Sequence, residues 1–172
     1  MKILKIKIQD RNVPIWGGVG SSVAILTALG FQHLGGLNPC ELCLWQRIPH
    51  GVIIVLALGA LLWFRGRRER TLIVILVAIA FAFSAAIALY HVGIEQGWIQ
   101  DSALCVGPSG LNKAQTTDEL RKLLMASSRV RCDEMSWTLF GLSIAAWNAL
   151  TSLLLGILCG IAGLRLLRGR TL

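Results

Sequence analysis

Four long apolar segments are the feature of this sequence that most constrains its fold. They cover roughly residues 14–34, 44–64, 71–91 and 139–164. Each is long enough to cross a hydrocarbon core about 30 Å thick, which takes about 20 residues of helix. With 55% hydrophobic residues, the 172-residue chain is also too apolar for an ordinary soluble domain. The sequence predicts an all-α membrane protein, a four-transmembrane-helix bundle that forms a single domain over residues 1–172.

The second segment is less typical than the others, because Arg47, Pro49 and His50 lie in its first two turns. The stretch that follows, GVIIVLALGALLWF, is too apolar for a loop. Polar side chains near a helix end can reach the headgroup region while the stem of the helix stays in lipid. We therefore interpret this segment as a transmembrane helix as well.

The N-terminal segment needs a separate test, because Lys2, Lys5 and Lys7 ahead of an apolar run also fit a cleaved signal peptide. The apolar run is longer than the core of a signal peptide, which has about 7–15 residues. No small-x-small cleavage pattern closes the run before Phe31. We therefore expect this segment to be the first transmembrane helix.

The basic residues are unevenly distributed around the four segments. Four precede the first segment, four lie in the connection RGRRER after the second, and three follow the last. In the long connection 92–138, six acidic residues outnumber five basic ones. Cytoplasmic connections carry the excess of Lys and Arg, so both termini are predicted to be cytoplasmic. The formal net charge of +8 is thus mainly a topology signal, and no basic patch interleaved with aromatic residues indicates nucleic-acid binding.

Four of the five cysteines fall on the non-cytoplasmic side, where disulfides form and persist. They are Cys40, Cys43, Cys105 and Cys132, whereas Cys159 lies inside the last segment and is interpreted as a small buried apolar side chain. Structural zinc sites usually have two closely spaced pairs, but 26 residues separate Cys105 from Cys132. This spacing favours disulfide chemistry over metal binding. Purely structural disulfides are an alternative.

The two cysteines at positions 40 and 43 lie at the predicted start of the second helix. Asn38 is a favoured N-cap residue, Pro39 suits the first helical position, and Glu41 completes a capping box. Two cysteines three residues apart on one helix face are compatible with a disulfide. Backbone amides and the positive end of the helix dipole favour a thiolate at this position, which predicts lowered cysteine pKa values and raised reactivity.

Arg47 follows Cys43 by four residues and therefore lies on the same helix stripe, one turn deeper in the membrane. A buried arginine needs a partner. We predict that its charge stabilises the Cys43 thiolate or a polar group of a bound ligand. The alternative interpretation is that the side chain only extends to the lipid headgroups.

The third connection carries Cys105 in the stretch DSALCVGPSG, where Pro108 and Gly110 oppose regular structure. We expect an exposed, mobile segment in which Cys105 is accessible to another protein. Farther along, a capping-box pattern from Thr116 to Glu119 predicts a short helix. This helix either lies on the membrane surface or packs against the ends of the bundle.

Three stretches of the sequence together resemble one known family. The stretch PCELCLWQR, the pair Tyr90-His91 and the stretch RCDEMSWTLFGLSIAAWNAL are similar to the bacterial disulfide bond formation protein B (DsbB) family, over essentially the whole chain. The resemblance implies a thiol oxidoreductase of the bacterial inner membrane, with redox loops 35–43 and 92–138 in the periplasm. Such an enzyme reoxidises a periplasmic DsbA-like thioredoxin-fold protein and passes the electrons to membrane quinone, either ubiquinone or menaquinone.

The resemblance also implies roles for individual residues. It divides the cysteines into a quinone-proximal pair, Cys40 with Cys43, and a partner-facing pair, Cys105 with Cys132. Arg47 matches the family arginine that is associated with quinone, and His91 matches a histidine near the same head group. These six residues are the predicted site, and no metal ligand is among them.

Some positions depart from the family pattern, and for others the family indicates no role. Gln46 stands where some family members carry an acid beside the arginine. The third connection varies freely in length and sequence across the family, so the preference for a particular partner does not transfer. We assign His33 and His50 local structural roles.

The mechanism that the resemblance implies is a chain of thiol–disulfide exchanges. The thiolate of the reduced partner attacks Cys105 and displaces Cys132, and Cys132 then attacks Cys40. This attack frees Cys43 as a thiolate, held by the helix terminus and Arg47, that donates electron density to the quinone.

Three alternatives are weighed against this mechanism. A DsbB-like paralogue dedicated to one client keeps the fold and changes the substrate. A non-enzymatic membrane scaffold uses its disulfides only to tie loops together, and redox cycling distinguishes it from an oxidase. An enzyme of the vitamin K epoxide reductase type also has two cysteine pairs in a helical bundle. There the CxxC follows the loop pair in the chain, which is the reverse of the order found here.

Overall fold

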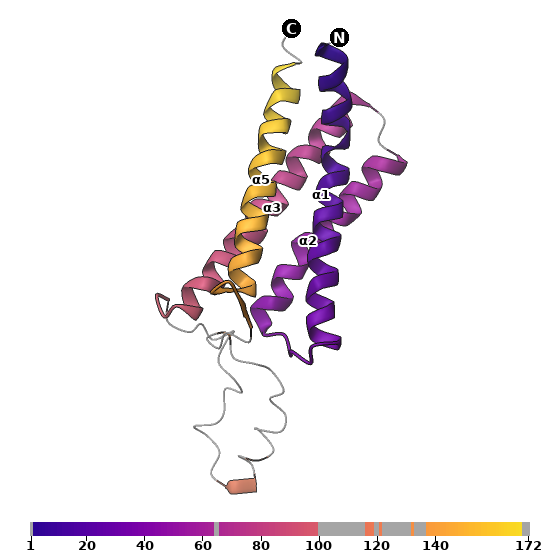
Figure 1. The fold of residues 1–172 in the computed structure, drawn as a ribbon. Coiled ribbons are helices and arrows are strands. Elements are labelled where there is room, and N and C mark those ends of the chain that lie inside the picture. Colours follow the sequence, from indigo (N-terminus) through magenta and orange to yellow (C-terminus); the bar gives the residue numbers. More distant parts are fainter. Residues whose placement is uncertain are drawn as a thin grey trace.

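The computed structural model contains four long helices (Figure 1). They are α1 (Lys2–His33), α2 (Glu41–Leu62), α3 (Arg67–Glu95) and α5 (Ile144–Arg168). The residues that the structure describes are 2–63, 66–99, 116–118, 121, 132 and 137–169. Within these ranges the protein is almost entirely helical, which confirms the predicted all-α class.

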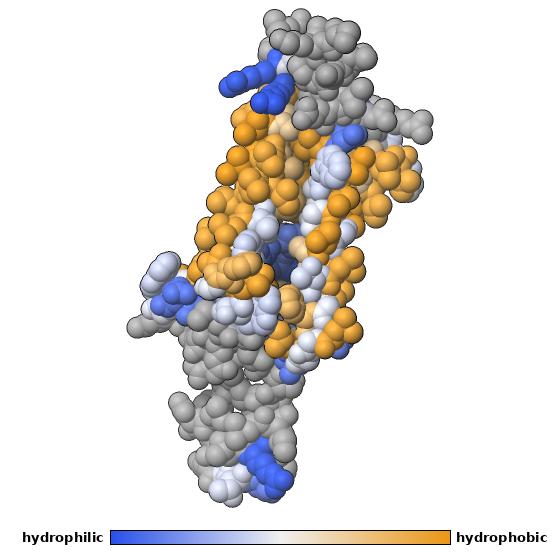
Figure 2. Space-filling view, in the orientation of Figure 1, coloured by the Kyte–Doolittle hydropathy of each residue, from blue (hydrophilic) through white to orange (hydrophobic). Residues whose placement is uncertain are grey.

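All four helices are long and apolar enough to cross a membrane. The candidate spans are Asn12–His33, Glu41–Leu62, Arg68–Glu95 and Ile144–Arg168. Large hydrophobic side chains are exposed on the outside of every helix, and Figure 2 shows the apolar surface that they form over the middle of the bundle. Such a surface suits lipid rather than water. The prediction of four transmembrane helices is therefore confirmed.

Different helix termini gather at the two ends of the bundle. The start of α1, the α2–α3 connection and the end of α5 lie at one end (Figure 1). The starts of α2 and α5 and the end of α3 lie at the other end. Residues from three separate parts of the sequence therefore meet at the second end.

Small residues let the helices approach closely. A Cβ atom added to Gly18 of α1 would lie 2.5 Å from the Cβ of Ala57 on α2. One added to Gly156 of α5 would lie 3.2 Å from the Cβ of Phe81 on α3. Phe81 and Cys159 belong to the main buried apolar cluster, and Cys159 is only 3% exposed, as expected for a small apolar side chain. Close backbone approach of this kind is a common basis of helix association in membranes.

The start of α2 differs from the prediction. Asn38 was the predicted N-cap, but the structure begins the helix at Glu41 with Cys40 as the N-cap residue. Cys40 has an extended backbone, with φ −74° and ψ 171°, and its sulfur accepts the backbone N–H of Cys43 at 3.2 Å. The prediction was wrong because it considered only oxygen-bearing side chains as caps, whereas here a sulfur satisfies one of the free amides of the first turn.

The start of α5 also differs from the prediction. The fourth segment was expected to begin near Leu139, but β1 (Thr138–Leu139) and β2 (Leu142–Ser143) form a short antiparallel hairpin there. Phe140 and Gly141 make the turn with positive φ angles of 53° and 77°, as two-residue hairpin turns require. Ser143 then caps α5 by accepting the backbone N–H of Ala146 at 3.1 Å. Apolar composition alone could not reveal this hairpin.

The short helix predicted to start near Thr116 falls mostly outside the described part of the chain, and so does Cys105. The predictions for both stay predictions.

Candidate redox site

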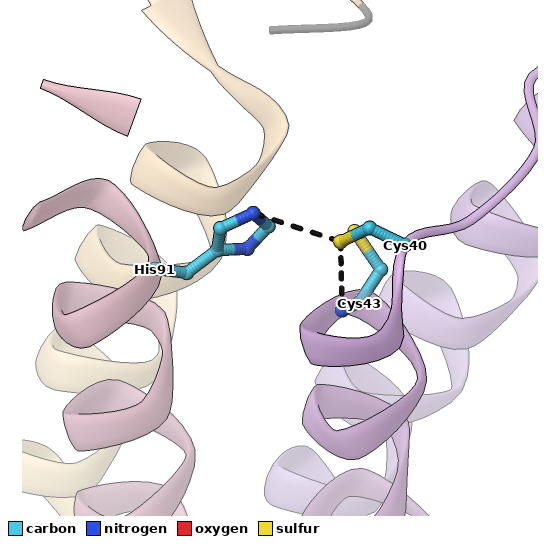
Figure 3. Close-up of side chains that lie close together, drawn as sticks. All are labelled: Cys40, Cys43 and His91. Atoms are coloured by element: carbon cyan, nitrogen blue, oxygen red, sulfur yellow. Dashed lines mark hydrogen bonds between the residues drawn. The ribbon is translucent and has the colours of Figure 1, made fainter. Parts of the chain in front are cut away.

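Two cysteines at the start of α2 form the centre of the site. Cys40 precedes the helix and Cys43 lies in its first turn, and their Sγ atoms are 2.9 Å apart. Both are free thiols, Cys40 buried and Cys43 half-buried. Figure 3 shows both side chains directed toward His91 of α3. The predicted pairing of these two cysteines is thus compatible with the observed geometry.

The two sulfurs are not equivalent. The thiol of Cys40 donates a hydrogen bond to the sulfur of Cys43, and this bond, together with burial, raises the pKa of Cys40 well above its ordinary value. The expectation of lowered pKa values at this helix terminus is therefore wrong for Cys40. The reason is that its neighbour is a second sulfur that competes for the same proton. In this arrangement Cys40 holds the proton and Cys43 accepts the hydrogen bond.

His91 connects this pair to α3 and α5. Its Nε2 lies 3.6 Å from the Sγ of Cys40 and 3.7 Å from an oxygen of Glu95, one turn along α3. The second oxygen of Glu95 accepts the hydroxyl of Ser143, the residue that caps α5. His91 is 4% exposed. The ends of three helices are thus tied together around the cysteine pair.

Cys132 also lies at this site, although it is distant in the sequence. It is 1% exposed and belongs to one buried cluster with Cys40, Leu42 and Ile94. The backbone of Cys132 is hydrogen-bonded to His91. Its thiol is free. The structure therefore gathers three of the four predicted redox cysteines.

A cavity of about 500 Å³ opens beside Cys43, between α1, α2 and α5. Its walls are mainly apolar, and its polar lining comes from residues around the start of α2, on α5 and on α1: Thr27, Asn38, Cys43, Gln46, Arg47, His50, Asn148 and Thr151. Figure 2 shows a hollow in the apolar surface with hydrophilic residues inside it. A cavity with apolar walls and a few polar groups is typical of a site for a small, largely apolar ligand.

Arg47 is placed at this cavity as its helix stripe predicted. Its Nη1 donates to the side-chain oxygen of Gln32 at 2.8 Å. Its Nε is buried and has no hydrogen-bond partner among the residues that the structure describes. A buried cationic donor without a partner is costly, so this N–H is well suited to an acceptor on a ligand.

The sequence did not identify several polar residues of the site. Glu95, Asn148 and Ser143 received no role, Gln46 was noted only as a departure from the family, and His50 was assigned a local structural role. Their polarity was itself a signal in the sequence, because a polar side chain inside a membrane helix is costly and tends to be functional. The sequence gives no way of telling which of these residues meet across helices.

The donor atoms of Cys40, Cys43 and His91 all lie within 4.8 Å of one another, which is close enough for a metal ion to be considered. Two sulfurs on a tetrahedral zinc ion are about 3.8 Å apart, given a Zn–S distance of about 2.3 Å. The observed separation of 2.9 Å is shorter. The geometry therefore favours a redox pair over a metal centre.

The fold and the site define a class, namely multi-pass membrane proteins with a thiol pair at a helix terminus beside a ligand cavity. The family model for "Disulfide bond formation protein DsbB" matches residues 10–162. The chain therefore belongs to the DsbB family. It is a bacterial membrane protein of disulfide bond formation, and the family implies disulfide oxidoreductase activity.

The alignments with individual relatives cover most of each relative and most of this chain. A "Disulfide bond formation protein B" of Stutzerimonas stutzeri is 31% identical over 157 residues, 88% of this chain and 93% of its own. One of Methylobacillus flagellatus is 32% identical over 82% of this chain and 85% of its own. "Uncharacterized protein RP370" of Rickettsia prowazekii is 27% identical over 82% and 80%. No solved structure matches the chain.

Proposed function

We propose that this protein reoxidises a periplasmic DsbA-like thioredoxin-fold protein and passes the electrons to membrane quinone, either ubiquinone or menaquinone. One observation carries the proposal. Cys43 of the Cys40–Cys43 pair lines a mainly apolar cavity that Arg47 also lines, and the Nε of Arg47 is buried without a hydrogen-bond partner among the described residues. A thiol pair that only tied loops together would need neither the cavity nor the arginine.

The cavity fits a quinone in three respects. Its apolar walls suit a ring and the start of an isoprenoid tail, the Nε–H of Arg47 suits a carbonyl oxygen, and Cys43 lines the same space. A quinone bound there would supply an acceptor for two electrons and two protons. Arg47 and Cys43 would hold the head group. His91 would exchange a proton with the neighbouring Cys40 through the 3.6 Å contact between its Nε2 and the Cys40 sulfur.

The proposed thiol exchange begins at the partner-facing disulfide, which we assign to Cys105 and Cys132. A thiolate of the reduced partner attacks Cys105, the disulfide breaks, and Cys132 leaves as a thiolate. Cys132 then attacks Cys40, and the bond between Cys40 and Cys43 breaks with its electron pair on Cys43. The shared burial of Cys132 and Cys40 in one cluster supports this second step.

We further propose that both chain termini face the cytoplasm and that the redox site lies at the periplasmic surface of the inner membrane. The distribution of Lys and Arg supports this orientation. It places the thiols where a periplasmic partner can reach them.

The function is tested by following quinone absorbance in detergent after adding a reduced DsbA-type protein. We expect turnover by the unmodified protein, none with Cys43→Ala, and full turnover with the control Cys159→Ala, because Cys159 packs far from the site among apolar side chains. A folded protein that reduced no quinone with any of several partners would contradict the proposal and support the scaffold alternative. Turnover with only one of several partners would indicate a client-dedicated paralogue.

A further inference from the structure

A chain of buried polar side chains runs from the redox pair into the middle of the bundle. The Nε2 of Gln46 lies 3.0 Å from the Nδ1 of His91, and the Nδ2 of Asn148 donates to the Oε1 of Gln46 at 2.7 Å. The Oδ1 of Asn148 lies 3.0 Å from the Nε2 of His50, whose Nδ1 lies 3.1 Å from the hydroxyl of Ser21. This series of hydrogen-bonded side chains therefore links all four helices at the level of the cavity.

The two amides fix the direction of every bond in this chain. An amide nitrogen only donates and an amide oxygen only accepts. The Nδ1 of His91 must therefore accept from Gln46, which leaves the proton of the neutral ring on Nε2, the atom that faces the Cys40 sulfur. By the same rule, the Nε2 of His50 donates to Asn148 and its Nδ1 accepts from Ser21.

The direction continues through the redox pair itself. The Nε2 of His91, whose hydrogen also serves the bond to the backbone of Cys132, lies 3.6 Å from the Cys40 sulfur, and the Cys40 thiol donates to Cys43. From Ser21 to Cys43, each residue of the network thus donates its hydrogen to the next residue toward Cys43. Aligned donors of this kind stabilise negative charge on the final acceptor.

Packing alone does not require these residues. His50, Gln46 and Ser21 are each at most 7% exposed, and apolar side chains of similar size would fill the same space without needing partners. Asn148 also accepts a hydrogen bond from Ser152 at 3.2 Å, so its orientation is held from a second side. A network this complete specifies one arrangement of its members.

We propose that Asn148 and His50 are positioning residues that act through Gln46 to hold His91 as the tautomer with its hydrogen on Nε2, the ring nitrogen next to the sulfur of Cys40. In this arrangement the network stabilises the thiolate at Cys43. The inference deepens the proposed function, because it rests on Cys43 being the thiolate that faces the cavity. It also gives His50 a role beyond the local structural one expected from the sequence.

The direct test is the tautomer of His91 in the reduced, quinone-free protein. Nitrogen-15 chemical shifts of labelled histidines distinguish a ring nitrogen that carries hydrogen from one that does not, and His91→Gln identifies the signals. We expect hydrogen on Nε2 alone in the unmodified protein. Asn148→Leu removes the donor that orients Gln46, so both tautomers of His91 should then be populated.

A second readout is the rate at which iodoacetamide alkylates Cys43, measured by mass spectrometry of its peptide. We expect Asn148→Leu to lower this rate at pH 7 by about tenfold, since the thiolate loses stabilisation by hydrogen bonds and its fraction falls. His50→Leu should lower it less, because Ser152 still donates to Asn148. His50→Gln should restore the rate, because its amide can donate to Asn148 as the imidazole does.

The matched control is Ser22→Ala. The Ser22 hydroxyl is adjacent to Ser21 in the sequence but donates to the Gly18 carbonyl of its own helix, so neither readout should change. Hydrogen on Nδ1 of His91 in the unmodified protein would overturn the proposal. So would unchanged tautomer and alkylation rate in an Asn148→Leu protein whose circular dichroism and thermal unfolding show it folded. Neither readout uses quinone or partner, so a failure here is distinguishable from a failure of oxidase activity.

Discussion

Among single residues, the two sulfurs of the CxxC differ in their neighbours. Cys40 is enclosed by Cys132, His91 and Cys43, whereas Cys43 borders the cavity. In the proposed mechanism, the residue that exchanges with another thiol and the residue that faces the quinone are therefore different. Sequence spacing could predict the pair, but it could not predict which sulfur holds the proton, since this depends on contacts with residues far along the chain.

Arg47→Lys is expected to weaken quinone binding. Lysine keeps the charge but has no counterpart to the buried Nε–H of Arg47, and it cannot also maintain the 2.8 Å bond to Gln32 in the same geometry. We predict an increase in KM for quinone of about tenfold, corresponding to one hydrogen bond of about 1.4 kcal/mol, with a smaller effect on kcat. Quinone titration at saturating partner measures both. An unchanged KM would show that Arg47 does not contact the ligand.

Cys132→Ala is expected to separate the two halves of the reaction. The Cys40–Cys43 pair keeps its own contacts with His91 and the helix terminus, so small dithiols should still reduce it and quinone should still reoxidise it. Oxidation of a DsbA-type partner should fall at least about a hundredfold, because the resolving thiol of the exchange is lost. Parallel assays with dithiothreitol and with the partner measure the two rates. Equal loss in both would mean that Cys132 mainly supports the fold of the site.

At the scale of helices and strands, the site depends on how closely the helices approach. Gly18→Ala adds a methyl group 2.5 Å from the Cβ of Ala57, and overpacking of this kind costs about 1–3 kcal/mol. We predict a lower midpoint of thermal unfolding in detergent. Gly30→Ala, in the same helix with no atom within 4 Å of the added Cβ, is the control and should not lower the midpoint. A similar effect of both substitutions would exclude packing as the cause.

The helices and their ends were predictable to different degrees. Four apolar runs predicted four helices, because backbone groups in lipid must be satisfied within the segment. The hairpin before α5 was not predictable from hydropathy, since WTLFGLS reads as a continuation of an apolar run and Phe140 has an unusual positive φ. The sulfur cap at Cys40 was missed for a related reason, namely that standard capping patterns contain oxygen.

For the molecule as a whole, the proposed function requires one orientation in the membrane. A membrane-impermeant maleimide applied to intact spheroplasts should label a cysteine substituted for the exposed Phe140 at the redox end. It should not label one substituted for the exposed Arg68 at the opposite end, where the basic residues cluster. Both variants are made in a protein without other cysteines. The reverse labelling pattern would contradict the proposed topology.

The polar network shows why a sequence could supply much of the site but not all of it. Cys40, Cys43, Arg47 and His91 belong to short stretches that resemble the DsbB family, so their presence at the site could be predicted before the fold was known. Ser21, Asn148 and Ser84 are polar residues of three different apolar segments, and their contacts with His50 follow only from how the helices pack. Pairing across helices depends on rotation and depth, which composition does not specify.

The most direct test of the central claim is a single turnover without any partner protein. The protein carries Cys105→Ser, Cys132→Ser and Cys159→Ala, is fully reduced, and is mixed anaerobically with one equivalent of a short-chain quinone. Electron balance predicts one quinol formed for each Cys40–Cys43 disulfide, measured by quinone absorbance and by thiol counting with mass spectrometry. A folded protein that kept both thiols while the quinone stayed oxidised would contradict the account.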